Sequence, residues 1–419
     1  MKHIYTSLDI GSDSIKIVVC ELYQNKLNLL ASSSVKSKGV KKGLITNVED
    51  AASSIKQAID DVEGMLNISI DRVIVSVPSY ATDYAVVKGE VEIKNEESIV
   101  SYDDIKEVLD VAIQSRKLDE NDELIAILPV DFKVDERKGL KDPINIHGNK
   151  LSVRAILVST QKKYVYSVIG LLDSMGIETV DISTNSIGDI HAFMSKDIES
   201  SVGVTINIGS ETTIVSLYNH GITIKNSIIN MGGKHVTNDI SYMYKTDSKT
   251  AEDLKLHFAL AHKRNASTSD MYEIKTEYDD ELKINQFEIS EVVSSRIEEI
   301  LNLAKKEINI LTSKRIDYII ITGGTSNMAD IDYVANDVFG HNVSIGNIKL
   351  VGIRDNKYSS CVGNIVYFIN KLKLKGQNYS MVNDSDASKL ASVRKGFQEI
   401  NNKEMLEKLT EYFLANRRI

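Results

Sequence analysis

The sequence contains no tryptophan, only two cysteines and only three prolines among its 419 residues. Two thiols cannot supply a disulfide framework for a chain of this length, so a reducing compartment is the simpler interpretation. Cys20 lies in an apolar run and is interpreted as a small buried hydrophobic residue. All three prolines fall between residues 75 and 145, which leaves helices and strands free to run unbroken elsewhere.

Long apolar runs and long basic blocks are also missing. No stretch approaches the roughly 20 apolar residues that span a bilayer, and a strand pattern starts at once, so we expect no signal segment. The net charge of −9 disfavours a nucleic-acid partner. Hydrophobic residues make up 42% of the chain and charged residues 26%, as in ordinary globular proteins. The length suggests two to four domains or subdomains.

A glycine turn between two apolar strands occurs twice. Strands predicted at 4–10 and 15–22 flank Gly11-Ser12-Asp13-Ser14, and the stretch 202–219 repeats this pattern around Gly209-Ser210-Glu211-Thr212-Thr213. Such self-similarity predicts a duplicated fold. Tight loops of glycine and small hydroxyl residues offer converging backbone N–H groups to phosphates. Asp9 precedes the first loop and is placed to hold hydrated Mg²⁺, and Lys16 follows it and could reach a phosphate.

A third glycine element follows a predicted buried strand at 317–322. Gly323-Gly324 could let the backbone lie against an adenine or a ribose, with Met328 just beyond. Gly232-Gly233 opens another predicted helix, whose N-terminus could face phosphates. P-loop and Rossmann glycine motifs are absent, which excludes those two nucleotide-binding classes.

Further elements are expected along the rest of the chain. Helices are predicted near 50–65, 103–115, 233–243, 250–262, 290–311 and 359–372, and strands near 72–77, 85–93, 123–134, 151–158 and 343–351. From Gly376 to Asn402, polar residues dominate and we predict a flexible linker. His235 and His257 are interpreted as ordinary solvated or hydrogen-bonded residues, and no spacing indicates a metal cluster.

These motifs, in this order, resemble the actin superfamily and, more closely, the family of the bacterial cell-division protein FtsA. The resemblance is carried by the segments Leu8–Lys16, Lys38–Ile45, Ile208–Thr213, Met231–Ile240, Ala251–Lys255, Glu291–Ile300 and Ile321–Thr325. It implies an α/β, duplicated actin-like (ribonuclease H-like) fold, with two halves around a nucleotide cleft and a 1C subdomain inserted in the first half.

The resemblance also implies subdomain boundaries. Subdomain 1A would take 1–80, 161–200 and 356–375, and 1C would take 81–160. Subdomain 2A would take 201–235 and 305–355, and 2B would take 236–304. Residues 376–402 would form the linker before a terminal membrane-targeting helix at 403–419.

The implied function is that of an ATP-binding, actin-like protein that polymerises on the cytoplasmic membrane at the septum. It would anchor FtsZ filaments, with the FtsZ C-terminal tail docking on 2B near Arg296, and it would bind other division proteins through 1C. Arg296 could equally be a solvated helix residue. The residues implied to contact ATP or ADP are Gly11, Ser12, Asp13, Ser14, Lys16, Gly209, Ser210, Glu211, Thr212, Thr213, Gly232, Gly233, Glu252, Lys255, Gly323, Gly324 and Met328.

The second loop departs from the family pattern, which has an Asp where this chain has Asn207. An amide cannot accept a proton or give Mg²⁺ a charged ligand. Glu211 could replace the missing acid as a magnesium ligand, or it could weaken triphosphate binding by repulsion. Asp9, Asn207 and Glu211 are the candidates near Mg²⁺, and none is assigned as catalytic. We expect slow or absent hydrolysis.

The end of the chain has one apolar helical face, formed by Met405, Leu406, Leu409, Tyr412 and Phe413. Four basic side chains against three acidic ones make the attraction to anionic lipid weak, so apolar burial must dominate. This helix could pack on the globular part or lie in the headgroup plane of a membrane. The linker before it favours the membrane, where many anchors on one filament would bind by avidity.

Three alternatives belong to the same superfamily. A sugar kinase would need a carboxylate base and a second substrate motif, which we do not find. A chaperone ATPase would need a substrate-binding domain after residue 375. A pilus-assembly relative would bind the tail of an inner-membrane partner and would generally lack the terminal helix.

Overall fold

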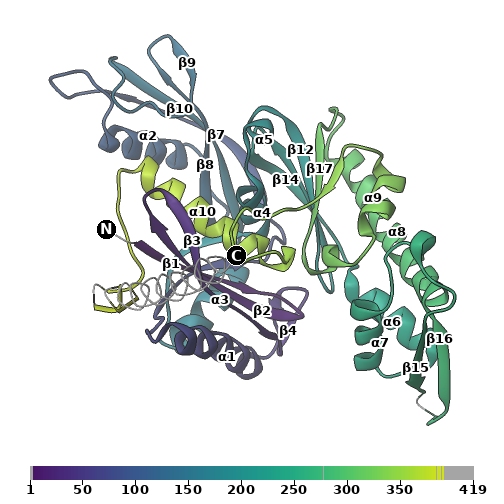
Figure 1. Ribbon diagram of the computed structural model, residues 1–419. Helices are drawn as coiled ribbons and strands as arrows, with labels where there is room; N and C mark the ends of the chain where they lie inside the picture. The colour runs from purple at the N-terminus through teal and green to yellow at the C-terminus, as the bar shows by residue number, and fades with distance from the viewer. Residues whose placement is uncertain (1–2, 277, 384, 388, 391–419) are drawn as a thin grey trace, which may run out of the picture.

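Two halves with the same architecture make up most of the molecule (Figure 1). The computed structural model describes residues 3–276, 278–383, 385–387 and 389–390. Each half is built on a five-stranded sheet, and the two sheets have the orders β3-β2-β1-β6-β11 and β14-β13-β12-β17-β18. In both, the first three strands are antiparallel neighbours and the last two continue in parallel. The predicted duplication is therefore confirmed.

The first sheet begins with the hairpin β1 (His3–Ile10) and β2 (Ser14–Tyr23) and continues to β3 (Lys26–Lys36). Its parallel strands are β6 (Arg72–Val77) and β11 (Glu178–Thr184). Helices α1 (Val48–Leu66) and α3 (Lys162–Ser174) cover one face, because both have an apolar stripe that joins the core of this half. The short hairpin β4 (Val40–Lys41) and β5 (Leu44–Ile45) lies before α1.

The second sheet repeats this plan with β12 (Val202–Ile208), β13 (Thr213–Asn219), β14 (Ile222–Ile229), β17 (Tyr318–Thr322) and β18 (Val343–Ile345). Helix α9 (Ile331–Phe339) and the long helix α8 (Gln286–Leu311) pack against it. The expected strand at 343–351 ends at Ile345. Only Val343–Ile345 pairs with β17, and the chain then leaves the sheet edge.

Helices α4 (Asn185–Phe193) and α10 (Ser359–Leu374) lie between the two sheets. One core cluster joins these helices to Tyr5 of the first sheet and Tyr218 of the second. The helices cross at two glycines: a Cβ on Gly363 would lie 1.6 Å from the carbonyl oxygen of Gly188. Only glycine allows this approach, so the joint between the halves depends on these two positions.

A separate unit interrupts the first half after β6 (Figure 1, upper left). Its sheet, in the order β7-β10-β8-β9, consists of β7 (Asp83–Glu92), β8 (Asp122–Val134), β9 (Arg137–Leu140) and β10 (Lys150–Gln161). Helix α2 (Tyr102–Gln114) starts at a capping box of Ser101 and Asp104 and packs on β7 at Gly89, where a side chain would collide with its backbone. The unit has its own hydrophobic core.

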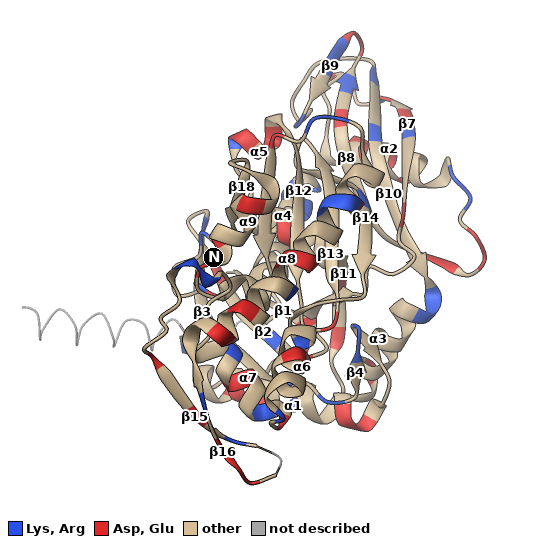
Figure 2. Ribbon diagram, turned by 90° about the vertical axis from the view of Figure 1, so that its right-hand side faces the viewer, with Lys and Arg blue, Asp and Glu red and all other residues tan. Residues whose placement is uncertain are grey.

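A smaller unit interrupts the second half after β14. It contains α6 (Gly233–Tyr244), α7 (Ser248–His257), the hairpin β15 (Met271–Lys275) and β16 (Glu281–Asn285), and the start of α8. Figure 2 shows this hairpin projecting from the body, with acidic and basic residues interspersed. The helix expected at 250–262 stops at His257, because the Leu260 and Ala261 amides bond to Ser290 and Ala329 instead of continuing the helix.

The start of the predicted linker is packed, which corrects that part of the prediction. Met381 is buried and its N–H donates to the Ile4 carbonyl of β1 (2.9 Å), and Tyr379 meets the ring of Phe368. The polar composition hid these anchoring side chains. The predicted helix at 403–419 lies outside the described residues. No helix in the described part of the chain has the length and apolar character needed to cross a bilayer.

Candidate functional site

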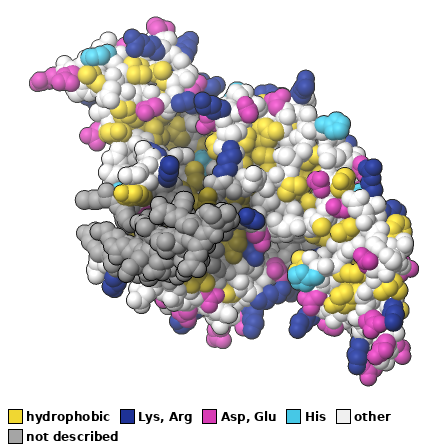
Figure 3. All heavy atoms as spheres, viewed as in Figure 1, with side chains coloured by type: hydrophobic (Ala, Val, Ile, Leu, Met, Phe, Trp, Pro, Cys, Tyr) yellow, Lys and Arg dark blue, Asp and Glu magenta, His cyan; other side chains and the backbone are white. Residues whose placement is uncertain are grey.

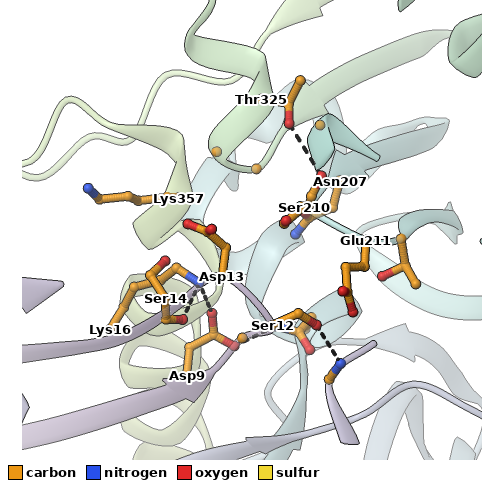
Figure 4. Close-up of a pocket in the computed structure, with 18 of the residues that line it drawn as sticks. Asp9, Ser12, Asp13, Ser14, Lys16, Asn207, Ser210, Glu211, Thr325 and Lys357 are labelled. Carbon is orange, nitrogen blue, oxygen red and sulfur yellow. Dashed lines mark hydrogen bonds and ion pairs between the residues drawn. The ribbon is translucent and has the colours of Figure 1, made fainter. Parts of the chain in front are cut away.

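A cavity of about 490 Å³ opens between the two halves, where the three glycine elements meet. The β1–β2 loop and the β12–β13 loop face it from opposite halves, and the turn after β17 completes it (Figure 4). Fifteen of the 17 residues implied to contact nucleotide line this cavity, as do Asp9 and Asn207. Thr213 and Gly232 do not.

The first loop carries a buried ion pair. The Lys16 ammonium lies 3.0 Å from a carboxylate oxygen of Asp9 and donates to the Ser14 carbonyl (3.1 Å). Burial alone would lower the pKa of Lys16, but the attraction of Asp9 outweighs it and raises the pKa. The other Asp9 oxygen accepts a hydrogen bond from the Asn185 amide (3.0 Å). Lys16 therefore carries a positive charge at the cavity wall.

The second loop is held from behind by α6. The N–H groups of Gly233 and Lys234 donate to the carbonyls of Gly209 and Ser210 (2.9 and 2.8 Å). These amides are therefore occupied, which corrects the expectation that the N-terminus of α6 faces phosphates. Gly232 is needed for this contact, since a Cβ there would lie 2.5 Å from the Gly209 oxygen. The buried Thr213 hydroxyl donates to the Met231 carbonyl. Thr213 and Gly232 therefore both support the second loop from outside the cavity.

The third element contributes backbone at one end of the cavity, and a buried lysine of α7 faces it. Gly323 has φ of +90°, and a Cβ there would lie 2.4 Å from the side-chain oxygen of Asn207. Across the cavity, Lys255 is buried and its ammonium donates to Glu252 (2.7 Å) and to the Thr237 hydroxyl (3.0 Å). Met328 is almost fully buried and closes this end of the cavity.

Asp189 is a buried acid behind the cavity that the sequence analysis missed. Its carboxylate accepts hydrogen bonds from the Asn207 amide (2.7 Å) and from the hydroxyls of Ser359 and Ser360 (2.7 and 2.8 Å). Burial raises the pKa of Asp189 to about 6, although these hydrogen bonds oppose the shift. An acid placed between the apolar residues Ile187 and Ile190 of α4 was the available signal.

Asn207 is thus fixed by Asp189 and does not stand free in the cleft. Its amide nitrogen faces the carboxylate, and its oxygen lies against Gly323. The chain therefore has no carboxylate at the end of β12, but it has one immediately behind it. This arrangement leaves no general base at position 207.

Glu211 extends across the gap between the halves. One carboxylate oxygen accepts the backbone N–H of Lys42 in the β4–β5 turn (2.7 Å), and the other meets the Lys234 ammonium (2.9 Å). Next to this contact, the Gly43 N–H donates to the Ser12 hydroxyl (2.8 Å). Lys42, Gly43 and Tyr80 were not predicted, because they reach the cavity only through the folding of β4, β5 and the strand exit after β6.

The donor set suits a hydrated Mg²⁺ better than a cage of protein ligands. Among the described residues, no three His, Cys, Asp or Glu side chains gather to hold an ion. Magnesium usually keeps several waters and takes one or two carboxylates together with phosphate oxygens. Asp9 lines the cavity and offers one such carboxylate, so it fits an outer-shell role.

Arg296 of α8 is already paired within its own unit. Its guanidinium donates to the Asp239 carboxylate of α6 (3.1 Å from Nη2) and to Glu299, and its side chain is 26% exposed. It is therefore not the solvated helix residue that we kept as an alternative. An acidic partner would have to compete with these two carboxylates.

A second cavity of about 400 Å³ lies away from the first, below the inserted unit. Leu109 of α2, Pro129 of β8, Tyr367 and Leu374 of α10 and Ile222 of β14 give it apolar walls. Lys375 stands at its edge, and burial together with nearby Lys371 lowers the pKa of Lys375.

Three of the solved structures similar to this one have the same two-lobed plan. PilM in the PilM–PilN type IV pilus biogenesis complex has a TM-score of 0.58 at 14% identity, covering 87% of this chain and 98% of that one. MreB5 of Spiroplasma citri bound to ADP has a TM-score of 0.54 at 16% identity, covering 89% and 98%. The ethanolamine utilization protein EutJ from Carboxydothermus hydrogenoformans has a TM-score of 0.53 at 14% identity, covering 87% and 89%. These likenesses confirm the actin-like fold.

Sequence comparison is more specific. The family model of the cell division protein FtsA matches residues 204–363, and the model of the SHS2 domain inserted in FtsA matches 82–159, so together they span more than half of the chain. FtsA of Bacillus subtilis (strain 168) is 27% identical over 89% of this chain and 85% of its own length. FtsA of Enterococcus hirae is 24% identical over 88% and 83%. This chain belongs to the family of the bacterial cell division protein FtsA.

Proposed function

We propose that this protein binds an adenine nucleotide with Mg²⁺ between its halves, polymerises on the cytoplasmic face of the membrane at the septum, and tethers FtsZ filaments there. The observation that carries the nucleotide part is the convergence of three glycine elements from distant parts of the sequence on one cavity. The name of the Spiroplasma citri relative records bound ADP, which supports the same ligand class. Isothermal titration of the full chain with ATP and ADP in Mg²⁺ tests it, and no measurable heat with either would reject the site.

Nucleotide acts here as a structural ligand that is hydrolysed slowly or not at all. Asn207 is an amide held by Asp189, and Asp9 is paired with Lys16, so neither of these two positions offers a free carboxylate to activate water. Phosphate release from ATP by the full chain measures this. A turnover rate in the range of ordinary kinases, on the order of 10 s⁻¹ or more, would contradict the proposal.

The subdomains follow the boundaries that the resemblance implies, with 1A and 2A as the two sheets, 1C as the unit at 81–160 and 2B as the unit at 236–304. Contacts between copies of the chain would stack these units into protofilaments. Negative-stain electron microscopy on a lipid monolayer tests this part, and a monomer at every concentration with ATP would reject it.

The tail of FtsZ would dock on 2B. This unit exposes several large apolar side chains, namely Tyr242, Met243, Leu256, Met271 and Tyr278. Figure 3 shows apolar side chains on the surface of this unit, at the lower right of the view. Arg296 stands close by as a cation that an acidic tail could take over from Asp239. Arg296→Ala should weaken binding of a fluorescent FtsZ tail peptide several-fold, whereas the matched control Arg72→Ala in the other half should not. Equal binding by both variants would contradict this docking site.

Membrane attachment would depend on residues 403–419. Co-sedimentation with anionic liposomes compares the full chain with a chain that ends at Asn402, each with and without ATP. We expect only the full chain to pellet, and we expect ATP to increase the pelleted fraction if polymer avidity contributes. If neither chain pellets, a pilus-type binding module becomes the better hypothesis, which the likeness to PilM in complex with PilN supports.

Other division proteins would bind through 1C. The apolar cavity between 1C, α10 and β14 suits a short apolar segment of such a partner, with Lys375 near its edge for an acidic group. A bulky substitution, Pro129→Trp, should block a partner that uses this cavity and leave nucleotide binding unchanged.

A further inference from the structure

Glu211 joins the two halves of the molecule at the phosphate end of the cleft. Its carboxylate takes the Lys42 N–H from the β4–β5 turn of the first half (2.7 Å) and the Lys234 ammonium from α6 of the second (2.9 Å). Figure 4 shows Glu211 beside the Ser12 loop, in the space between the two loops. Its side chain is only 14% exposed, so the contact is part of the cavity wall.

The donors that hold Glu211 are the kinds that bind phosphate. A free backbone N–H and a lysine ammonium both form charge-assisted hydrogen bonds with phosphate oxygens. Burial would raise the pKa of Glu211, but the hydrogen bonds from Lys234 and Lys42 outweigh it and hold the pKa below its ordinary value. The group is therefore a negative charge that occupies phosphate-type donors beside the phosphate loops.

Two hydroxyl groups on the same wall have no hydrogen-bond partner among the described residues. They belong to Ser79 and Tyr80, which line the cavity where the chain leaves β6. Both residues line the same cavity as Glu211, and burial and then the charge of Glu211 raise the pKa of Tyr80. A buried unpaired hydroxyl costs free energy, so these groups are suited to a ligand oxygen.

We propose that Glu211 discriminates between nucleoside triphosphates and diphosphates, which rests on the proposed nucleotide site. A diphosphate fits between the two loops and leaves the Glu211 bridge in place. A third phosphate needs the same Lys42 and Lys234 donors and is repelled by the carboxylate, so it binds only by displacing Glu211. The terminal phosphate then joins the halves in place of the carboxylate and meets the Tyr80 hydroxyl.

The test compares the affinities of the full chain for ADP and for a non-hydrolysable ATP analogue by isothermal titration. Glu211→Gln keeps an acceptor and removes the charge. It should tighten the triphosphate analogue about tenfold, as the loss of one nearby like charge predicts, and change ADP affinity less than about twofold. Asp13→Asn is the matched control, because it removes a carboxylate from the same place in the first loop whose partner, Lys36, lies in the same half. Asp13→Asn should change the affinities for both nucleotides by the same factor, and Glu90→Gln in 1C should change neither affinity.

Hydrogen exchange of the Lys42 amide gives a readout that does not need nucleotide. Without ligand, this amide should exchange faster in Glu211→Ala than in Glu211→Gln or the unaltered chain. An unchanged triphosphate-to-diphosphate ratio in Glu211→Gln, or an equal change of ratio in Asp13→Asn, overturns the proposal and leaves the nucleotide site standing. If the unaltered chain binds neither nucleotide, the proposed nucleotide site itself is rejected. If the exchange rate of the Lys42 amide is unchanged in Glu211→Ala, the hydrogen bond between Glu211 and Lys42 does not form in solution.

Discussion

The β1–β2 and β12–β13 loops occupy equivalent places in the two sheets, yet their acidic side chains have different kinds of partner. In the first loop, Asp9 and Asp13 each pair with a lysine of their own half, Lys16 and Lys36. In the second, the strand ends in Asn207 and the only loop acid, Glu211, reaches a backbone amide of the other half. Duplication thus preserved the backbone shape of the loop, while one copy keeps its charges local and the other uses a charge to connect the halves.

The largest expected effect is on the free energy of unfolding, and it comes from the crossing of α4 and α10 behind both loops. In Gly363→Ala, the new methyl group would collide with the Gly188 carbonyl, so α4 and α10 would have to separate. We expect a loss of about 3 kcal/mol or more in the free energy of unfolding, measured with urea. Gly170→Ala is the matched control: this glycine is also inside a helix, with nothing within 4 Å of a Cβ, and should gain about 0.5–1 kcal/mol. Equal effects of the two changes would mean that the helix crossing is loose in solution.

The buried acid behind the second loop should give stability a pH dependence. Because folding raises the pKa of Asp189 to about 6, the folded state holds its proton more tightly than the unfolded state. The stabilisation is then full below about pH 4 and is lost as the pH rises to about 6. Asp189→Asn should remove roughly 2–3 kcal/mol of this change, measured by urea unfolding at pH 4.5 and 7. Asp181 is also buried and has a raised pKa, so its own contribution to the pH dependence of the free energy of unfolding should remain in that variant. The same slope in both proteins would show that Asp189 does not titrate in this range.

Restoring symmetry between the loops sharpens the comparison. Asn207→Asp would place a second carboxylate against Asp189 in a buried site, where two like charges cannot both be ionised cheaply. We expect a loss of about 1–3 kcal/mol at pH 8 that shrinks at pH 5.5, as one of the two acids takes a proton. The same Asn207→Asp change in an Asp189→Asn background should cost less. A loss independent of both pH and residue 189 would point to a steric cause.

The smallest effect is expected for the exposed pair of the first loop. Lys36 is 72% exposed and Asp13 is 47% exposed, so water screens their attraction. Lys36→Met should change the free energy of unfolding by less than about 0.5 kcal/mol, whereas Lys234→Met should also alter the triphosphate-to-diphosphate affinity ratio by freeing Glu211. If both variants had the same triphosphate-to-diphosphate affinity ratio, the Lys234–Glu211 pair would not differ in function from the Lys36–Asp13 pair.

The sequence by itself determined the duplicated hairpins, the glycine turns and most element bounds. These depend on short-range rules: apolar alternation marks strands such as β1 and β6, and glycine marks backbone that must approach closely. The sequence also indicated that the loops of the two halves would face one cavity, since the two copies share strand order. The terminal helix at 403–419 stays a prediction.

Only the tertiary structure decided which polar groups meet. Asp189 with Asn207, Glu211 with Lys42, and Arg296 with Asp239 are separated by 18 to 169 residues and lie on elements whose relative placement no local pattern encodes. The burial of Met381 against β1 was hidden for the same reason, because the stretch that follows Gly376 is mostly polar. Hydrogen bonds and pKa shifts depend on distances of a few ångströms and on exclusion of water, and both are set by packing after the chain has folded.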